Sequence, residues 1–214
     1  MSARERIGVV GTGRIAGTLL AAAARFAPDV PLTAAGRNAA AAADLVDRIP
    51  GLVLASAVDL ARTCDLVLLA VPPEAYRALA EEIGPYLRED AVLVSLTNGV
   101  ALEDLAAWAG RPVAKVIPTM AQRTGRGVTL ITASAGLPRP AVARVERFLA
   151  RFSLPLSIDD RDSRIASNVA GSALAVLAEF CERYVAANAA HAVALDRDVL
   201  AAAMAETVGA LAAL

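Results

Sequence analysis

Short apolar runs alternate with segments of helical periodicity along most of the chain. The apolar runs predict strands at residues 7–11, 32–35, 52–55, 65–71, 91–96, 113–117, 128–132 and 154–158. Residues 65–71 show no alternation of polar and apolar positions, as expected of a parallel strand that is covered on both faces. Helices are predicted between the strands at residues 14–26, 38–49, 72–87, 102–108 and 139–152. This alternation predicts an α/β protein with a doubly wound parallel sheet.

The pattern changes after Asp159. Residues 163–214 contain no proline and are rich in alanine, with larger apolar residues at helical spacing. They predict one long helix to about Ala190 and a second from Asp196 to the end. Two apolar helices cannot bury their faces alone in about 55 residues. They need the α/β domain or a second subunit to cover them, and we favour an intertwined homodimer through these helices. The sequence thus predicts two regions: an α/β domain, residues 1–159, and a small all-α dimerisation and substrate region, residues 160–214.

Composition narrows the class of protein. Of the 214 residues, 57% are hydrophobic and 20% are charged, which favours a packed core over disorder. A net charge of −1 without a basic cluster argues against nucleic acid or a membrane surface as a partner. No apolar stretch reaches the roughly 20 residues of a membrane span, and the charged start does not look like a signal peptide. We therefore expect a cytoplasmic protein.

The residues that commonly bind metals or carry redox chemistry form no motif. Cys64 and Cys181 have no partner at the spacing of a metal or redox site, so we expect two buried free thiols and no metal. The single histidine, His191, lies among alanines in the predicted helix, and we expect a structural or surface role for it.

A glycine-rich loop follows the first predicted strand. Residues 11–16 read Gly-Thr-Gly-Arg-Ile-Ala and fit the pattern G-x-G-x-x-G/A. Gly11 permits the tight turn, Gly13 lets the backbone approach a pyrophosphate, and Ala16 keeps helix and strand close. The helix that begins here supplies N–H donors to the phosphates. This context predicts a Rossmann-type dinucleotide site in which Thr12, Arg14 and Ile15 also contact the cofactor.

The end of the second predicted strand indicates which cofactor binds. Enzymes that use NAD place an acidic residue there to bind the ribose hydroxyls. This chain has no acid at that point but has Arg37, followed by Asn38. Arg37 is placed to meet a 2′-phosphate, although a solvated arginine beside a helix-capping Asn38 is the alternative. The sequence therefore predicts NADP.

The ends of later strands should line the nicotinamide cleft. Ligands of open α/β sheets bind outside the carboxyl ends of the parallel strands. The residues that we expect at these ends, and assign to cofactor binding, are Ala70, Val71, Pro72, Asn98, Pro118 and Thr119.

Taken in order, these motifs resemble the pyrroline-5-carboxylate reductase family. After its glycine loop that family usually reads A-V-K-P, matched here by residues 70–73, and then S-I-x-x-G-[IV], matched by residues 95–100. A V-M-P-N strand end is matched by residues 116–119, and a Gly-Val-Thr-Leu run by residues 127–130. The resemblance covers nearly the whole chain, and the order and spacing of the motifs are its specific part.

The resemblance implies a small cyclic imine as substrate, reduced by hydride from the nicotinamide at a site shared with the helices of a dimer. The family opens its long helix with S-G-S-G-P-A, which residues 170–175 match in part. Ser172 matches the second serine of that motif, and Ser167 falls near a family threonine. Hydroxyls near this helix start are implied to hold the substrate carboxylate and ring nitrogen, so both serines are candidate catalytic residues.

The chain departs from the family pattern mainly in its substrate half. Pro72 replaces the lysine of A-V-K-P, and Thr119 replaces the asparagine of M-P-N. Ala170, Ala173 and Leu174 replace the first serine and the Gly-Pro pair of the helix motif. These departures fit a divergent, short member, similar to late-competence relatives that carry I-P-[ST] at the strand end.

Several functions remain open. An NADPH-dependent imine reductase is favoured by the glycine loop, Arg37 and Ser172. A non-catalytic, regulatory NADP-binding protein would explain the altered helix motif. A deazaflavin-dependent NADP reductase begins with a similar domain, but the long helical tail argues against it. A hydroxyacid dehydrogenase would need a lysine in the helical region, and none follows Lys115.

Overall fold

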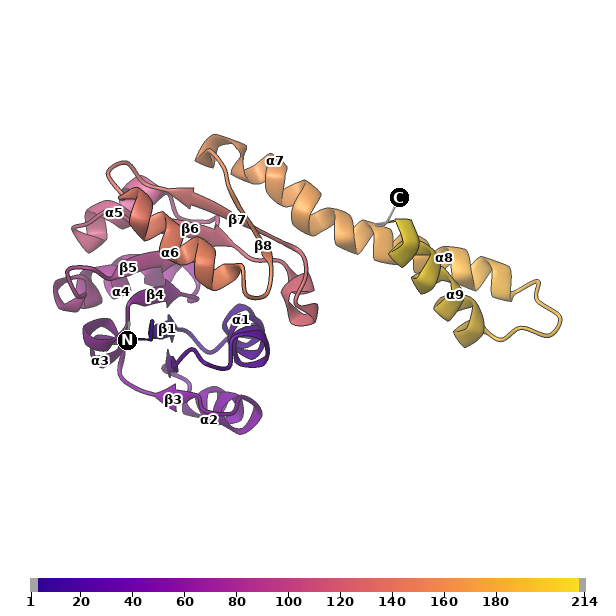
Figure 1. Ribbon diagram of the computed structural model, residues 1–214, viewed down its shortest axis with the longest axis horizontal. Coiled ribbons are helices and arrows are strands. Elements are labelled where there is room, and N and C mark those ends of the chain that lie inside the picture. The colour runs from indigo at the N-terminus through magenta and orange to yellow at the C-terminus, as the bar shows by residue number, and fades with distance from the viewer. Residues whose placement is uncertain (1–3, 212–214) are drawn as a thin grey trace. The chain divides into compact units, whose positions relative to one another are not determined.

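The computed structural model describes residues 4–211 and has the predicted order of strands and helices (Figure 1). The chain divides into two compact units, residues 1–167 and residues 168–214. The first unit is built on one eight-stranded sheet with strand order β3-β2-β1-β4-β5-β6-β7-β8. Its strands are β1 (Ile7–Val10), β2 (Leu32–Ala35), β3 (Val53–Leu54), β4 (Leu66–Leu69), β5 (Val92–Ser95), β6 (Ala114–Ile117), β7 (Val128–Ala133) and β8 (Leu154–Ser157).

Helices cover both faces of this sheet (Figure 1). They are α1 (Arg14–Phe26), α2 (Ala39–Arg48), α3 (Ala57–Thr63), α4 (Tyr76–Ile83), α5 (Leu102–Ala109) and α6 (Arg139–Leu149). Buried residues of α1, α2 and α6 share one core cluster with one face of the strands, and those of α3, α4 and α5 share a second cluster with the other face. The α/β fold with a doubly wound sheet is therefore confirmed.

Two local features differ from the prediction. β7 runs antiparallel to β6, because residues 118–127 hold only the 3-10 turn η3 (Met120–Thr124) and are too few for a crossover. The other neighbouring strands pair in parallel. Helix α3 was not predicted; its N-cap Ser56 accepts a hydrogen bond from the Asp59 N–H.

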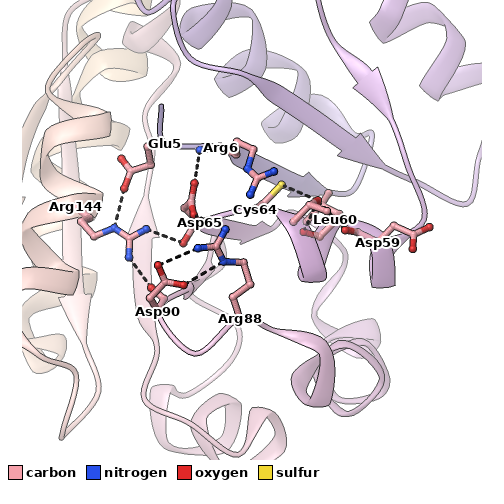
Figure 2. A network of polar contacts seen from close by, with 10 residues as sticks. Glu5, Arg6, Asp59, Leu60, Cys64, Asp65, Arg88, Asp90 and Arg144 are labelled. Carbon is pink, nitrogen blue, oxygen red and sulfur yellow. Dashed lines mark hydrogen bonds and ion pairs between the residues drawn. The ribbon is translucent and has the colours of Figure 1, made fainter. Parts of the chain in front are cut away.

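A network of charged side chains joins the elements at the amino ends of β1, β4 and β5 (Figure 2). Arg144 of α6 pairs with Glu5 at 2.8 Å, and Arg88 pairs with Asp65 at 3.2 Å and with Asp90 at 3.1 Å. This edge is opposite the carboxyl ends where ligands of such sheets bind, so the network belongs to the scaffold.

The second unit is helical. A π-helical segment (Asn168–Ser172) precedes α8 (Ala173–Ala189), and α9 is Arg197–Leu211. Two helices were predicted here, and the last residues of the second, 212–214, lie outside the described residues. An ion pair between Arg197 and Glu182 joins α9 to α8. His191 lies exposed in the turn after α8, not within the helix, and Cys181 is only half-buried.

One helical run is long and apolar enough to cross a membrane when judged by length and composition. It is Asp160–Ala189, with a mean hydropathy of 1.2 in its most apolar window. The sequence analysis expected no such run. A single helix of this kind is weak evidence, because helices of soluble proteins pass the same test.

Candidate functional site

The glycine loop lies where the sheet reverses its strand order, between β1 and β4. Gly11 has a φ of 125°, a conformation that residues with a side chain rarely adopt. A Cβ at this position would lie 2.2 Å from the carbonyl oxygen of Ala70, directly after β4. Only glycine therefore lets the loop pass this close to the end of the neighbouring strand.

The start of α1 is open to a ligand. Gly13 is the N-cap, no side chain caps the helix, and its first turn holds no acidic residue. A Cβ on Gly13 would meet no atom within 4 Å. The first N–H groups of a helix have no partner within it, and together with the helix dipole they attract anions. The geometry thus fits a pyrophosphate, with Thr12, Arg14 and Ile15 beside it.

The end of β2 lies against the same loop. A Cβ on Gly36 would be 2.4 Å from the methyl group of Thr12, so this glycine permits the close approach. Arg37 follows and is exposed, and no hydrogen bond or ion pair engages it among residues 4–211. Asn38 caps α2, because its side chain accepts a hydrogen bond of 3.0 Å from the Ala41 N–H. The guanidinium of Arg37 is free to bind an anion at this edge.

The ends of β4 and β5 are held together by Tyr76, a residue that the sequence analysis did not single out. Its buried hydroxyl donates to the Leu69 carbonyl at 2.5 Å and accepts from the Leu96 N–H at 3.2 Å. Burial raises the pKa of Tyr76, so the hydroxyl keeps its proton. Beyond these bonds lie two segments predicted to bind the cofactor: residues 70–72 after β4 and Asn98 after β5.

The end of β6 carries a buried hydroxyl without a partner. Pro118 follows the strand, and Thr119 is 8% exposed, with no hydrogen bond to its Oγ1 among the described residues. A buried polar group that lacks a hydrogen bond is costly and is usually satisfied by water or a ligand. A Cβ on Gly127 would lie 2.9 Å from this Oγ1. Thr119 therefore remains a candidate for ligand binding.

One predicted catalytic residue contacts a predicted cofactor residue. Ser167 ends α7 (Ser163–Ser167), and its Oγ lies 3.3 Å from Nδ2 of Asn98, which donates to it. The Ser167 hydroxyl itself donates to the Ser163 carbonyl at 2.6 Å. The fold thus brings together two residues that are 69 positions apart in the chain.

The other predicted catalytic residue, Ser172, belongs to the second unit. It is exposed and ends the π-helical segment Asn168–Ser172. Such segments are rare and occur frequently at functional sites. No residue pattern predicted this distortion, although it falls on the stretch that resembles the family's helix motif.

Comparisons with known proteins agree with this geometry. Residues 6–99 match the family model described as NADP oxidoreductase coenzyme F420-dependent. The chain is 26% identical to ComE operon protein 4 of Bacillus subtilis over 200 residues, which span 91% of this chain and 72% of that protein. It is 25% identical to the pyrroline-5-carboxylate reductase of Pseudomonas aeruginosa over 158 residues, which span 72% of this chain and 58% of that enzyme.

Solved structures share the fold over nearly the whole chain. The pyrroline carboxylate reductase of Plasmodium falciparum with NADP bound superposes with a TM-score of 0.83 at 20% identity, over 98% of this chain and 78% of that one. The predicted resemblance to pyrroline-5-carboxylate reductases is thereby confirmed, and NADP, the cofactor predicted from the sequence, is the one in that structure.

Proposed function

We propose that this chain is an NADPH-dependent oxidoreductase that reduces a small cyclic imine of the pyrroline-5-carboxylate type by hydride transfer. The observation that carries the proposal is the uncapped start of α1, which faces the point where the strand order reverses. NADPH bound there would supply the hydride and leave as NADP. The matched family model and the reductase relatives support this class of reaction.

The residues of the first unit would hold and orient the cofactor. Backbone N–H groups at Gly13 and Arg14 bind the pyrophosphate, and Arg37 binds the 2′-phosphate. The segments after β4, β5 and β6, which include Val71, Asn98 and Thr119, flank the nicotinamide. Hydride transfer needs donor and acceptor carbons about 3–3.5 Å apart, so these segments act by positioning.

Ser167 is suited to the imine nitrogen. A hydroxyl has one donor and two acceptor sites, and Ser167 uses its donor on the Ser163 carbonyl and one acceptor site on Asn98. The remaining lone pair can accept the N–H of a protonated imine, the form that takes up hydride readily. A substrate carboxylate would instead need donors. We assign the carboxylate to Ser172, the other hydroxyl at the helix start that the family resemblance implies for the substrate.

The substrate role of Ser172 can be tested by Ser172→Ala. Turnover should fall while the affinity for NADPH stays unchanged, because this serine would contact only the substrate. Unchanged turnover in the variant would count against the assignment.

A regulatory NADP-binding protein is the second candidate. Alanines and a leucine replace the family residues at positions 170, 173 and 174, so the substrate part of the pattern has changed more than the cofactor part. In that case the chain would bind NADPH and a protein partner without turnover.

We further propose that the second unit forms a homodimer and that the protein is cytoplasmic. Val185 is the one buried residue of α8 among the described residues, whereas Val176, Leu177, Phe180 and Tyr184 are each more than half exposed. An apolar surface of this kind usually marks an interface. Light scattering at micromolar concentration should give the mass of a dimer, and Phe180→Asp should shift it to a monomer. A sharp monomer mass for the unchanged chain would refute the proposal.

The deciding experiment follows NADPH oxidation with pyrroline-5-carboxylate at saturating cofactor. We expect turnover of about 1 per second or faster, as is typical of enzymes. If protein that demonstrably binds NADPH shows no turnover, the imine substrate is wrong and the regulatory function becomes the better account.

A further inference from the structure

Lys115 is the only lysine in the sequence, and it is buried in the middle of β6. Its side chain is 4% exposed, and Nζ lies 3.0 Å and 3.2 Å from the two carboxylate oxygens of Asp160. The Asp160 side chain is 35% exposed, so most of the desolvation cost falls on the lysine, and such a pair often adds little net stability. The contacts of Asp160 instead indicate a positioning role for the pair.

Asp160 joins the segment that leads into α7 to two strands of the sheet. It begins the turn Asp160–Asp162 that leads directly into α7. Besides the contact with Lys115, its Oδ1 accepts a hydrogen bond of 2.9 Å from the Thr132 hydroxyl. Lys115 and Thr132 are register partners on β6 and β7. The Lys115 ammonium group of β6 and the Thr132 hydroxyl of β7 therefore meet at one carboxylate, which precedes α7.

Ser167 lies at the other end of the short helix that starts from this carboxylate. The seven residue steps from Asp160 to Ser167 pass through a 3-10 turn and then α7, and at about 1.5–2.0 Å per step they span roughly 10–14 Å. Asp160 holds the N-terminal end of α7 against β6 and β7. The hydrogen bond from Asn98 to Ser167 holds the C-terminal end of α7 at the segment after β5. Any shift of the N-terminal end would move the Ser167 hydroxyl relative to the end of β5.

We infer that the Lys115–Asp160 pair is a positioning device that sets where Ser167 lies over the carboxyl end of β5. Neither residue would touch the substrate or the cofactor; they act through α7. The inference rests on the proposed function, because it makes the pair a determinant of how well the imine binds and reacts. The proposed phosphate contacts, at the glycine loop and Arg37, lie at the ends of β1 and β2, so the affinity for NADPH should change little even though Asn98 contacts Ser167.

The test compares Asp160→Asn, Lys115→Met and the milder Thr132→Val, which leaves the ion pair in place. Hydrogen exchange of residues 163–167 should become faster in each variant. The KM for pyrroline-5-carboxylate should rise and kcat should fall. The ratio kcat/KM should therefore drop by about tenfold to a hundredfold, the scale expected for a misplaced group. The Kd for NADPH should stay within about twofold, as for distant sites. Asp160→Glu should restore part of the loss.

Arg144→Met is the matched control, because it removes another partly buried ion pair, with Glu5, at the opposite edge of the sheet. It should lower the melting temperature without changing the KM for the imine. If Asp160→Asn behaves like this control and exchange at residues 163–167 is unchanged, the inference is wrong. Should Asp160→Asn and Lys115→Met fail to fold, Asp160→Glu decides, because it keeps the charge but lengthens the side chain that holds the start of α7: unchanged exchange and an unchanged KM in this variant would then refute the inference.

The two proposals fail in different ways. If the unchanged chain shows no imine turnover, the proposed function fails, but the exchange measurements still decide whether the pair holds α7. If turnover is present and neither exchange nor KM responds to the variants, only the positioning inference fails.

Discussion

At the scale of single residues, Gly11 and Gly13 have different physical tasks although they belong to one motif. Gly11 combines a positive φ with a Cβ position only 2.2 Å from a backbone oxygen, so the fold itself requires glycine there. Gly13 has an ordinary extended conformation with open space beside it. Its task concerns the ligand, because a side chain would stand where the pyrophosphate is expected.

This difference predicts opposite results for two alanine variants. Gly11→Ala should lower the free energy of unfolding by several kcal/mol, roughly 2–4, through steric overlap and backbone strain. Gly13→Ala should change it by no more than about 1 kcal/mol but weaken NADPH binding strongly. Urea unfolding and fluorescence titration with NADPH measure the two quantities. Equal NADPH affinity in Gly13→Ala and the unchanged chain would contradict the assigned task.

Arg37 should determine the preference for NADPH over NADH. A hydrogen bond to a charged group contributes about 1.5–3 kcal/mol, which corresponds to about tenfold or more in affinity. Arg37→Ala should therefore weaken NADPH binding by about that factor and leave NADH unchanged. Arg48→Ala is the control, because it removes an exposed ion pair with Asp44 on α2. It should change neither the affinity for NADPH nor that for NADH. Equal dissociation constants for the two cofactors in the unchanged chain would refute the preference.

At the scale of elements, the central strands could be predicted because their residues are almost all buried, and most helices because apolar residues recur in them at helical spacing; glycine, proline or a capping residue often marks their ends. β4, for example, is followed by Pro72 and Pro73, and α2 begins after Asn38. The direction of β7 could not be predicted from periodicity, since it depends on how the short connection before the strand folds. The π-helical segment has no residue pattern of its own, and the sequence therefore gave no warning of it.

The candidate site could be predicted where one segment carries it and not where distant segments meet. The glycine loop and Arg37 are local patterns. The contacts of Tyr76 with the ends of β4 and β5, and of Lys115 with Asp160, exist only once the chain has folded, because the partners are 7 to 45 residues apart. Asn98 and Ser167 were both singled out, yet nothing in the sequence linked them.

Tyr76→Phe tests whether these strand ends need the buried hydroxyl. The variant keeps the ring but removes the donor to the Leu69 carbonyl and the acceptor for the Leu96 N–H. Loss of such buried bonds should cost about 1–3 kcal/mol of unfolding free energy and loosen the segments that flank the nicotinamide. Tyr86→Phe, at a half-exposed tyrosine, should change stability little. If Tyr76→Phe is as stable as the unchanged chain, the hydroxyl does not hold the strand ends.

At the scale of the whole molecule, the cofactor and substrate tasks can be separated by cutting the chain. Both core clusters consist of residues between 7 and 152, all within the first unit. A fragment of residues 1–167 should therefore unfold cooperatively and bind NADPH within about threefold of the full chain, because no predicted cofactor contact lies beyond it. It should also be monomeric and lack imine turnover, since Ser172 and the proposed dimer interface are missing.

Calorimetry, NADPH titration and the oxidation assay measure these properties side by side with the full chain. Loss of NADPH binding in a folded fragment would place part of the cofactor site in the second unit, whereas full turnover would show that the helices are not needed for the substrate.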